Sequence, residues 1–478
     1  MIKARILRLD LAPGSSLNER SLANEMGVSQ TTVRNAFDLL EKDGLLIRKK
    51  GLSAESIRPD NTSIRNLYQF HYILTKGAAA QAAVMESFKD YAQDMESFAE
   101  KADEIAFNYE KDIYEAVNDE IVFHRSFVEM AGNTFFSSAE KQICDRLYFY
   151  TMLMYRSEEF KACFAPGSAG HGELWELYKR GVKTGNMKVF DASLKLHMAR
   201  NMITDWGEKA AEDPYDDELS KMMILSSLYE RHGKTLTMAE EYEIIRKNDP
   251  FMSVKSAVAM LFIDSLMKGR FGCHTEVNIS HIADELEISR NPVRQAAEQL
   301  IEYGYLKRDK NKKIYPSEMN SKVRMDLYIY RLIFEPYAAR LAAENANEKE
   351  LDNILKTLMS SEKAYRENDV SSFVYYDGLF HLEITCASHN SYMAKIYRSI
   401  LVFSRMAMNE IATKNKWTAE NLSERVREHR KIYAAVKNRR KELSYEYAKE
   451  HMLKGSEQNM DIHDKRKFID TMDFYLEM

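Results

Sequence analysis

A short segment occurs twice in this chain of 478 residues, and no other feature constrains the fold as strongly. The clearer copy, SRNPVRQA, begins at Ser289, and the looser copy, SQTTVRNA, begins 260 residues earlier at Ser29 (289 minus 29). Each copy follows a short helical pattern and a turn. Apolar residues then recur at helical spacing, which predicts a helix with one face against a core. These apolar residues are Val33, Phe37 and Leu40 in one copy and Val293, Ala297 and Leu300 in the other.

The opposite face of each predicted helix is polar. Side chains of this kind can donate hydrogen bonds to base edges and phosphates in a DNA major groove. A solvated helix face is the plainer interpretation of the same residues. The candidate DNA-contacting residues are Gln30, Thr31, Arg34, Asn35, Arg290, Asn291, Arg294 and Gln295, with Lys49, Lys310 and Lys312 as candidate phosphate contacts.

The flanking sequence predicts a winged helix-turn-helix around each copy. In the first, residues 19–26 are a predicted helix, Gly27 suits the turn, and residues 45–51 indicate a strand that leads into a basic hairpin. In the second, Glu287 stands at the position of Gly27, so a strained turn is expected there. The second copy has a complete first helix, whereas the first begins at Met1 with about half of one.

Composition limits the kind of protein. The net charge of -5 excludes a uniformly basic nucleic-acid binder, so contacts to DNA must come from local patches. The four cysteines lack CxxC pairing, which favours a reducing compartment over a disulfide scaffold. The sequence shows neither an apolar run of about 18 residues nor a signal peptide. We therefore expect a cytoplasmic protein without a membrane partner.

The remaining pattern is helical, and it predicts a mostly α fold in which a winged helix-turn-helix and an all-helical bundle each occur twice. The expected winged helix-turn-helix domains are residues 1–62 and 251–318. The expected helical domains are 63–207 and 319–458, with a linker and extra helix at 208–250 and a tail at 459–478.

Histidines and acids recur in register in the two helical domains. Asp377 and His381 are four residues apart, which puts both on one helix face. His429 is expected at a helix start and His451 on the following helix. Three imidazoles and a carboxylate in a bundle suit a divalent metal, zinc first, with nickel, manganese or iron as alternatives. The corresponding residues of the first half are Glu120, His124, His171 and His197.

Each half resembles the GntR superfamily of bacterial transcription regulators, in the FadR-type branch with an FCD effector domain. The family's SRTPVREAL marker is matched from Ser289 and more loosely from Ser29, and the acid-x3-His step and later histidines match its FCD markers. The resemblance implies a regulator of operator DNA, usually a homodimer, whose effector is a small carboxylic acid bound at the metal. Two fused units imply a pseudo-dimer within one chain, with or without further dimerisation.

The resemblance also implies an arginine that clamps the acid. Arg331 fits, with Arg405 as a second candidate, although Arg331 can instead form a structural ion pair. The first half has His71 and Thr75 in place of Arg331 and Glu335. Without a guanidinium fork its pocket is expected to hold a carboxylate less well, to bind something else, or to bind metal for structure only.

Two other functions fit the same residues. An open site of three histidines and a carboxylate can activate water, as in a metal-dependent hydrolase, but no HExxH motif or further general base is apparent. A metal-stabilised interaction scaffold is the third hypothesis. The duplicated DNA-binding pattern favours the regulator, and the protein is not expected to be an enzyme.

Overall fold

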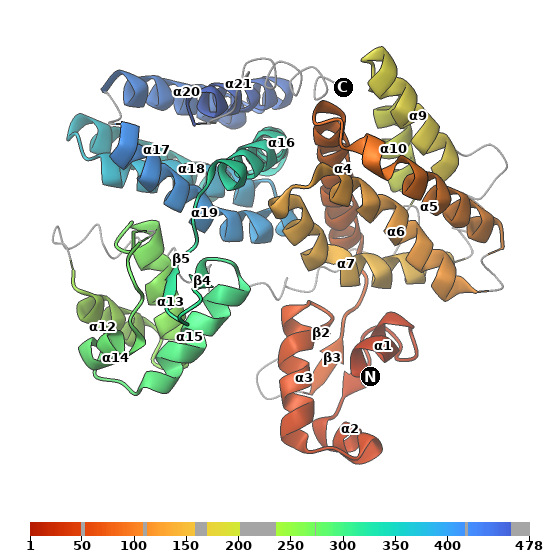
Figure 1. Ribbon diagram of the computed structural model, residues 1–478, viewed down its shortest axis with the longest axis horizontal. Coiled ribbons are helices and arrows are strands. Elements are labelled where there is room, and N and C mark those ends of the chain that lie inside the picture. Colours follow the sequence, from red (N-terminus) through yellow and green to blue (C-terminus); the bar gives the residue numbers. More distant parts are fainter. Residues whose placement is uncertain are drawn as a thin grey trace. The chain divides into compact units, whose positions relative to one another are not determined.

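The computed structural model describes residues 1–48, 53–108, 112–157, 170–200, 236–272, 274–415 and 419–459. It is mostly helical, and it divides into two compact units (Figure 1). The first is built mainly from Met1–Tyr215, and the second from Asp216–His389 and Met393–Ile462. Among the described residues, no helix is both long and apolar enough to cross a bilayer.

The first unit begins with a small helical domain that carries a three-stranded antiparallel sheet in the order β1-β3-β2. Its helices are α1 (Ile2–Leu7), α2 (Glu19–Met26) and α3 (Gln30–Lys42), and its strands are β1 (Ser16–Leu17), β2 (Leu46–Ile47) and β3 (Ala54–Ser56).

Local signals set the boundaries of α2 and α3. Gly27 ends α2 in the left-handed region with φ 66°, which a glycine adopts without steric cost. The side chain of Ser29 caps α3 by accepting a hydrogen bond from the backbone N–H of Thr32. Phe37 is fully buried on the inner face of α3. The predicted helix-turn-helix is therefore present with the expected helices. The predicted strand is shorter than expected, and the hairpin tip, with Lys49, lies outside the described residues.

The helical domain of the first unit follows directly on the sheet. Figure 1 shows its helices, coloured from brown to olive. They are α4 (Asn61–Val84), α5 (Phe88–Asn108), α6 (Ile113–Ala131), α7 (Thr134–Tyr155), α9 (His171–Thr184) and α10 (Lys188–Arg200).

The second unit has the same order of parts. Its small domain comprises α12 (Met238–Asn248), α13 (Val254–Met267), α14 (Ile279–Glu285), α15 (Arg290–Glu302) and the antiparallel pair β4 (Leu306–Arg308) and β5 (Ile314–Pro316). Its helical domain comprises α16 (Ser321–Asn345), α17 (Glu348–Arg366), α18 (Val370–Ala387), α19 (Ser391–Asn415), α20 (Ala419–Lys437) and α21 (Lys441–Asn459).

Helix α12 falls in the segment that the sequence analysis assigned to a linker. Its apolar face, with Tyr242 and Ile245, belongs to the same buried cluster as α13 and α15. The buried Glu241 accepts hydrogen bonds from Arg270 at 2.8 Å and from Lys268 at 3.2 Å. This helix is thus packed into the small domain of the second unit. The rest of the expected extra helix, up to residue 235, lies outside the described residues, as does the tail after residue 459.

The expected differences between the two small domains are present. Helix α13 has 14 residues where α1 has 6. Glu287 adopts the left-handed region with φ 53°, at the place where Gly27 ends α2. A residue with a Cβ costs roughly 1–2 kcal/mol in this conformation, so the turn before α15 is strained as predicted.

Two large apolar residues of α3, one buried and one exposed, test the core of the first small domain. Phe37→Ala should destabilise this domain by about 3–5 kcal/mol, because it empties a fully buried site. Leu39→Ala is the matched control, since Leu39 is 62% exposed, and its effect should stay within about 0.5 kcal/mol. Hydrogen exchange of the α3 amides measures the destabilisation that each variant causes. Equal protection in the two variants would contradict the packing.

Candidate metal centres and DNA-binding face

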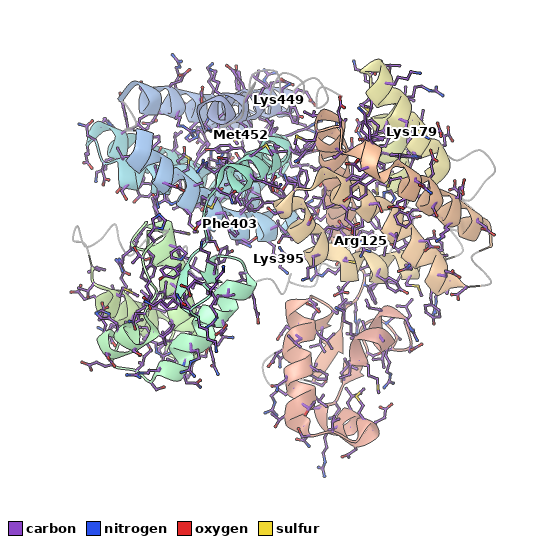
Figure 2. All side chains as sticks on the ribbon, viewed as in Figure 1. Arg125, Lys179, Lys395, Phe403, Lys449 and Met452 are labelled. Atoms are coloured by element: carbon purple, nitrogen blue, oxygen red, sulfur yellow. The ribbon has the colours of Figure 1, made fainter. Side chains whose placement is uncertain are left out.

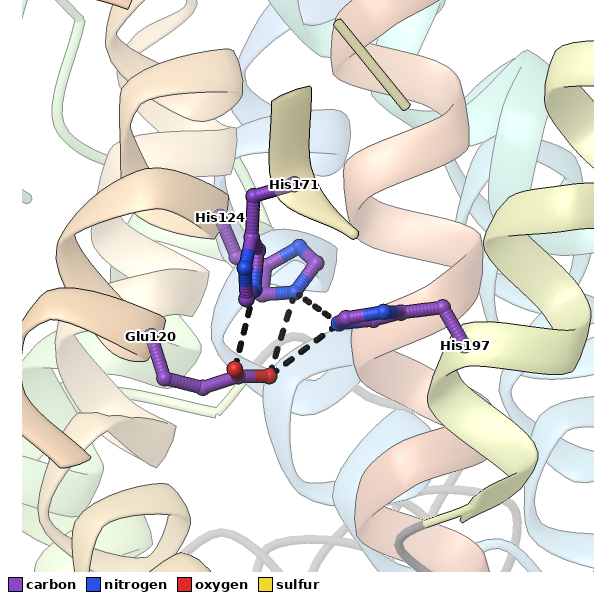
Figure 3. Close-up of side chains that lie close together, drawn as sticks. All are labelled: Glu120, His124, His171 and His197. Carbon is purple, nitrogen blue, oxygen red and sulfur yellow. Dashed lines mark hydrogen bonds and ion pairs between the residues drawn. The ribbon is translucent and has the colours of Figure 1, made fainter. Parts of the chain in front are cut away.

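Four predicted ligands meet in the core of the first helical domain (Figure 3). Glu120 and His124 lie one turn apart on α6, His171 is the first residue of α9, and His197 comes from α10. All four are buried, and one donor atom from each lies within 4.8 Å of the others. The i, i+4 spacing and two distant helices therefore converge on one point, as in metal sites of helical bundles.

The carboxylate of Glu120 lies among the three imidazoles. Its Oε2 is 2.9 Å from Nε2 of His171, and its Oε1 is 3.2 Å from Nε2 of His197. Nε2 of His124 is 3.1 Å from Nε2 of His197. Each imidazole thus presents the same ring nitrogen to the centre of the cluster.

Asp103 of α5 contacts the backbone N–H and Nδ1 of His171, and it is a site residue that was not predicted from the sequence. Its carboxylate accepts hydrogen bonds from the backbone N–H groups of His171 at 2.7 Å and Gly172 at 2.9 Å, and it lies 3.1 Å from Nδ1 of His171. Burial raises the pKa of Asp103, but the hydrogen bonds from His171 and from the backbone N–H of Gly172, together with the charge of His171, outweigh burial and hold the pKa below its usual value. No spacing in the sequence links residue 103 to residue 171.

Three histidines meet in the second helical domain. His381 lies on α18, His429 on α20 and His451 on α21, all buried, with donor atoms within 4.8 Å of one another. Nε2 of His429 is 3.3 Å from Nε2 of His451. The expectation that His429 begins a helix is wrong: α20 begins at Ala419, so His429 lies in its interior and reaches the cluster from mid-helix.

Asp377 lies at the edge of this second cluster. Its Oδ1 is 3.6 Å from Nε2 of His429 and 3.4 Å from a terminal nitrogen of Arg425. The three imidazoles form the close group without it. Asp377 is therefore near enough to approach a metal ion, but it is shared with a guanidinium.

Outer carboxylates orient two imidazoles of the second cluster. Glu335 Oε2 is 2.9 Å from Nδ1 of His381, and Glu428 Oε2 is 2.7 Å from Nδ1 of His451. An acceptor on Nδ1 fixes the ring and leaves Nε2 to face the centre, an arrangement typical of metal-binding histidines. Nε2 of His381 has no hydrogen-bond partner among the described residues.

Both donor sets fit a divalent metal. Imidazole binds metal in its neutral form. Burial, and then the neighbouring imidazole of His451, lower the pKa of His429 well below its usual value. Burial likewise lowers the pKa of His451. Both rings are thus neutral near pH 7, with nitrogen lone pairs available to an ion.

The two predicted effector-binding arginines are buried in the second unit. Nε of Arg331 donates to Glu335 Oε1 at 2.5 Å, so the structural ion pair considered from the sequence is present. Arg405 donates from a terminal nitrogen to the backbone oxygen of Met267 at 3.0 Å and lies over the Tyr375 ring at 5.0 Å. Burial lowers the pKa of Arg405 to about 10, which leaves it charged near pH 7.

The corresponding part of the first domain has no such pair. His71 Nε2 is 3.8 Å from Glu140 Oε2, too far for a hydrogen bond. Both side chains and the hydroxyl of Thr75 are buried without hydrogen-bond partners among the described residues. Because burial disfavours the charged form, the pKa of Glu140 rises to about 7.

The candidate DNA-contacting side chains are exposed on α3 and α15 wherever the structure describes them. Arg34 forms an ion pair with Glu19 at 2.9 Å, so part of its charge is engaged within the domain. Arg294 is exposed and forms no side-chain ion pair among the described residues. The exposed candidates are Gln30, Thr31, Arg34, Asn35, Arg290, Asn291, Arg294, Gln295, Lys310 and Lys312.

Two family models match parts of this chain. Residues 1–55 match "Bacterial regulatory proteins, gntR family", and residues 326–454 match "FCD domain". The chain carries a GntR-type DNA-binding domain at its N-terminus and an FCD domain at its C-terminus. The FCD match contains the second histidine cluster, and the GntR match contains α3.

Similar proteins include two curated regulators. The chain is 27% identical over 192 residues to the uncharacterized HTH-type transcriptional regulator YdhC of Bacillus subtilis, covering 39% of this chain and 81% of that protein. It is 25% identical over 186 residues to the Nta operon transcriptional regulator of Aminobacter aminovorans, covering 39% and 85%. Among solved structures, E. coli McbR/YncC matches 43% of this chain and 96% of its own, with 20% identity and a TM-score of 0.40.

The shifted pKa of Glu140 predicts a pH-dependent stability. Folded Glu140 stays protonated up to about pH 7, whereas its usual pKa is 4.5, so the folded state binds more protons between these values. Stability should therefore fall as the pH rises through this window.

Glu140→Gln should remove this dependence and increase stability at pH 8 by up to about 3 kcal/mol, with little change at pH 4. Urea unfolding at pH 4 and pH 8 measures the free energy of unfolding of each variant. Glu100→Gln, at an exposed position of α5, is the control and should leave the pH profile unchanged. A variant that keeps the slope of the unaltered protein would contradict the assignment to Glu140.

Proposed function

We propose that this protein is a transcription regulator that binds operator DNA through α3 and α15 and responds to a small carboxylic acid bound near a metal in its helical domains. The observation that carries this proposal is that a GntR-type domain and an FCD domain occur in one chain with a buried histidine cluster inside the FCD match. The curated relatives are transcriptional regulators.

We further propose that the chain is a fused pair of regulator units. Both units run from a small domain with a helix-turn-helix and a strand pair into a domain of six described helices. The match to YdhC uses 39% of this chain but 81% of that relative, so one unit is about the length of a relative. Two recognition helices on one polypeptide can address two half-sites of an operator, as a homodimer does.

The chemistry of the clusters supports a divalent metal. The ligands would be Glu120, His124, His171 and His197 in the first domain and His381, His429 and His451 in the second, where Asp377 lies at the edge of the cluster. Nitrogen-rich sites of this kind suit zinc first, and nickel, manganese or iron next. A bound metal would supply a positive charge in a dry core that attracts a carboxylate.

Arg405 offers a route from the second cluster to its DNA-binding domain. Its side chain lies against Gly378, since a Cβ placed on Gly378 would be 3.2 Å from the Arg405 side chain. Gly378 adjoins Asp377, and the other end of Arg405 holds the backbone oxygen of Met267 at the end of α13. A shift of α18 on ligand binding would therefore be transmitted to α13 through one buried side chain.

Further contacts hold α19 against the small domain of the second unit. Phe403 of α19, labelled in Figure 2, packs against the ring of Tyr305 with centroids 5.0 Å apart. The Tyr305 hydroxyl donates to the backbone oxygen of Ser399 at 3.0 Å. Asn409 also donates to the oxygen of Met267, at 2.9 Å. Helix α19 is thus fastened to the DNA-binding domain along several of its turns.

The DNA-binding role predicts the effect of Arg294→Ala. Binding to a duplex from the region upstream of its own gene should weaken by about 1–3 kcal/mol, because an exposed arginine of the recognition helix is lost. Fluorescence anisotropy at several salt concentrations measures the affinity. Arg366→Ala, at an exposed position of α17, is the control and should leave binding unchanged. Unaltered affinity in Arg294→Ala would count against α15 as a recognition helix.

The route through Arg405 predicts an effect on coupling. In the unaltered protein, operator affinity should differ several-fold between metal-loaded and chelator-treated samples. Arg405→Met keeps most of the packing volume but removes the hydrogen bond to Met267, so this ratio should fall toward one. Arg366→Met is the matched control. A ratio that Arg405→Met leaves intact would show that the signal takes another path.

A further inference from the structure

The acidic residue occupies a different place in each histidine cluster. In the first, the carboxylate of Glu120 reaches the middle: it lies 2.9 Å from His171, 3.2 Å from His197 and 3.5 Å from His124, measured to each Nε2. The longer glutamate side chain allows this reach from the α6 backbone. Three imidazoles and one carboxylate then supply the four donors of a closed tetrahedral zinc site.

In the second cluster the carboxylate lies at the edge of the group of imidazoles. Asp377 is one methylene shorter, and its Oδ1 lies 3.6 Å from His429 and 3.4 Å from the guanidinium of the buried Arg425. The carboxylate of Asp377 is thus shared between an imidazole and a buried guanidinium. Three protein donors with a fourth position left to an exchangeable ligand are typical of open metal sites.

The two clusters also differ in the cations that lie beside their carboxylates. In the second, the carboxylates of Asp377, Glu335 and Glu428 are each paired with a cation, Arg425 at 3.4 Å, Arg331 at 2.5 Å and Lys454 at 3.0 Å. Each of these three carboxylates therefore has a cation beside it before a metal enters; Lys454 also pairs with Glu424 at 3.4 Å and Glu450 at 3.1 Å. A divalent ion would therefore leave the second cluster positive, which favours an anionic fourth ligand.

The first cluster has no such cations. Among the described residues, neither Glu120 nor Asp103 forms an ion pair with a lysine or arginine; both lie against histidines, and the Tyr155 hydroxyl also donates to Glu120 at 3.4 Å. Two carboxylates then balance a divalent ion without any added anion. The place of Arg331 is taken by His71, which brings no fixed positive charge.

A small cavity adjoins the second cluster. It has a volume of about 10 Å³, room for roughly one water molecule. His381, Glu335 and Thr385 provide its polar lining. His381 is the one cluster histidine in this lining, so the cavity lies at the edge of the cluster, beside Glu335.

We propose that the two clusters divide the work: Glu120, His124, His171 and His197 hold a metal permanently as part of the fold, while His381, His429 and His451 hold a metal whose open position takes a small carboxylate. The proposal rests on the metal binding proposed above. It assigns the ligand response of the chain to its second helical domain.

Cobalt(II) distinguishes the two centres, because its visible absorption reports coordination number. The full chain is loaded with cobalt as His197→Ala, which leaves the second site intact, and as His451→Ala, which leaves the first. Acetate and succinate are then titrated into each. The spectrum of His197→Ala should change with saturation, and that of His451→Ala should not. A carboxylate-dependent spectrum in His451→Ala would overturn the proposal.

Metal release gives a second readout that needs no carboxylate. A chelator should remove one metal from the unaltered chain at least ten-fold faster than the other, and His451→Ala should lack the fast phase. Release at one common rate would also overturn the division.

Two conservative variants keep the test valid where a histidine variant fails to fold. Glu120→Gln should weaken metal binding at the first site by more than about 100-fold, since it removes a direct ligand. Asp377→Asn should weaken the second by no more than the roughly 10–100-fold typical of outer residues. The reverse order would contradict the assignment.

Failure of the proposed function gives a different result. A folded chain that takes up no cobalt at either cluster would refute metal binding itself. Two bound metals with identical spectra, release rates and carboxylate responses would leave metal binding standing and refute only the division of roles.

Discussion

The structure depends on the burial of imidazole groups in apolar helical cores. A buried polar ring is costly unless its nitrogens find partners, and burial holds such a ring neutral. Asp103 and Glu428 meet this need by accepting from Nδ1 of a histidine, at 3.1 and 2.7 Å, and Glu335 Oε2 lies 2.9 Å from Nδ1 of His381. The opposite nitrogen of each ring is then turned toward its neighbours. A set of anchored imidazoles that share a common centre is a candidate metal site, and the helices are arranged around it.

Each helical domain is also fastened to the small domain of its own unit through a buried arginine. Arg405 of α19 donates to the backbone oxygen of Met267, and Nε of Arg146 of α7 donates to that of Gly44 at 3.2 Å. Met267 and Gly44 both lie at or just beyond the end of a helix, where carbonyl groups lack helical partners. A guanidinium that donates to such a carbonyl group links the two domains without an ion pair. Its position therefore depends on the packing of both domains.

Local features of the chain were predictable because their causes are local. The turn at Gly27, the cap at Ser29 and the apolar stripe through Phe37 involve residues a few positions apart. The two-residue strand β1 was not predicted, because it exists only by pairing with β3, in the register Ser16 with Glu55. The place of α12 was missed for the same reason: its pattern indicates a helix, but only α13 and α15 show which face is buried.

The sequence by itself determined the helix-turn-helix, the predominance of helices and the histidines that meet in each core, because periodicity, capping and a repeated spacing record these in the order of the residues. The tertiary structure alone decided which partners Glu120, Asp377 and Arg405 have. It brought Glu120 among the three histidines of the first cluster, placed Asp377 against Arg425 and placed Arg405 against Met267. These outcomes depend on side-chain reach and on partners supplied largely by other helices, and distances of this kind are fixed only when the helices pack.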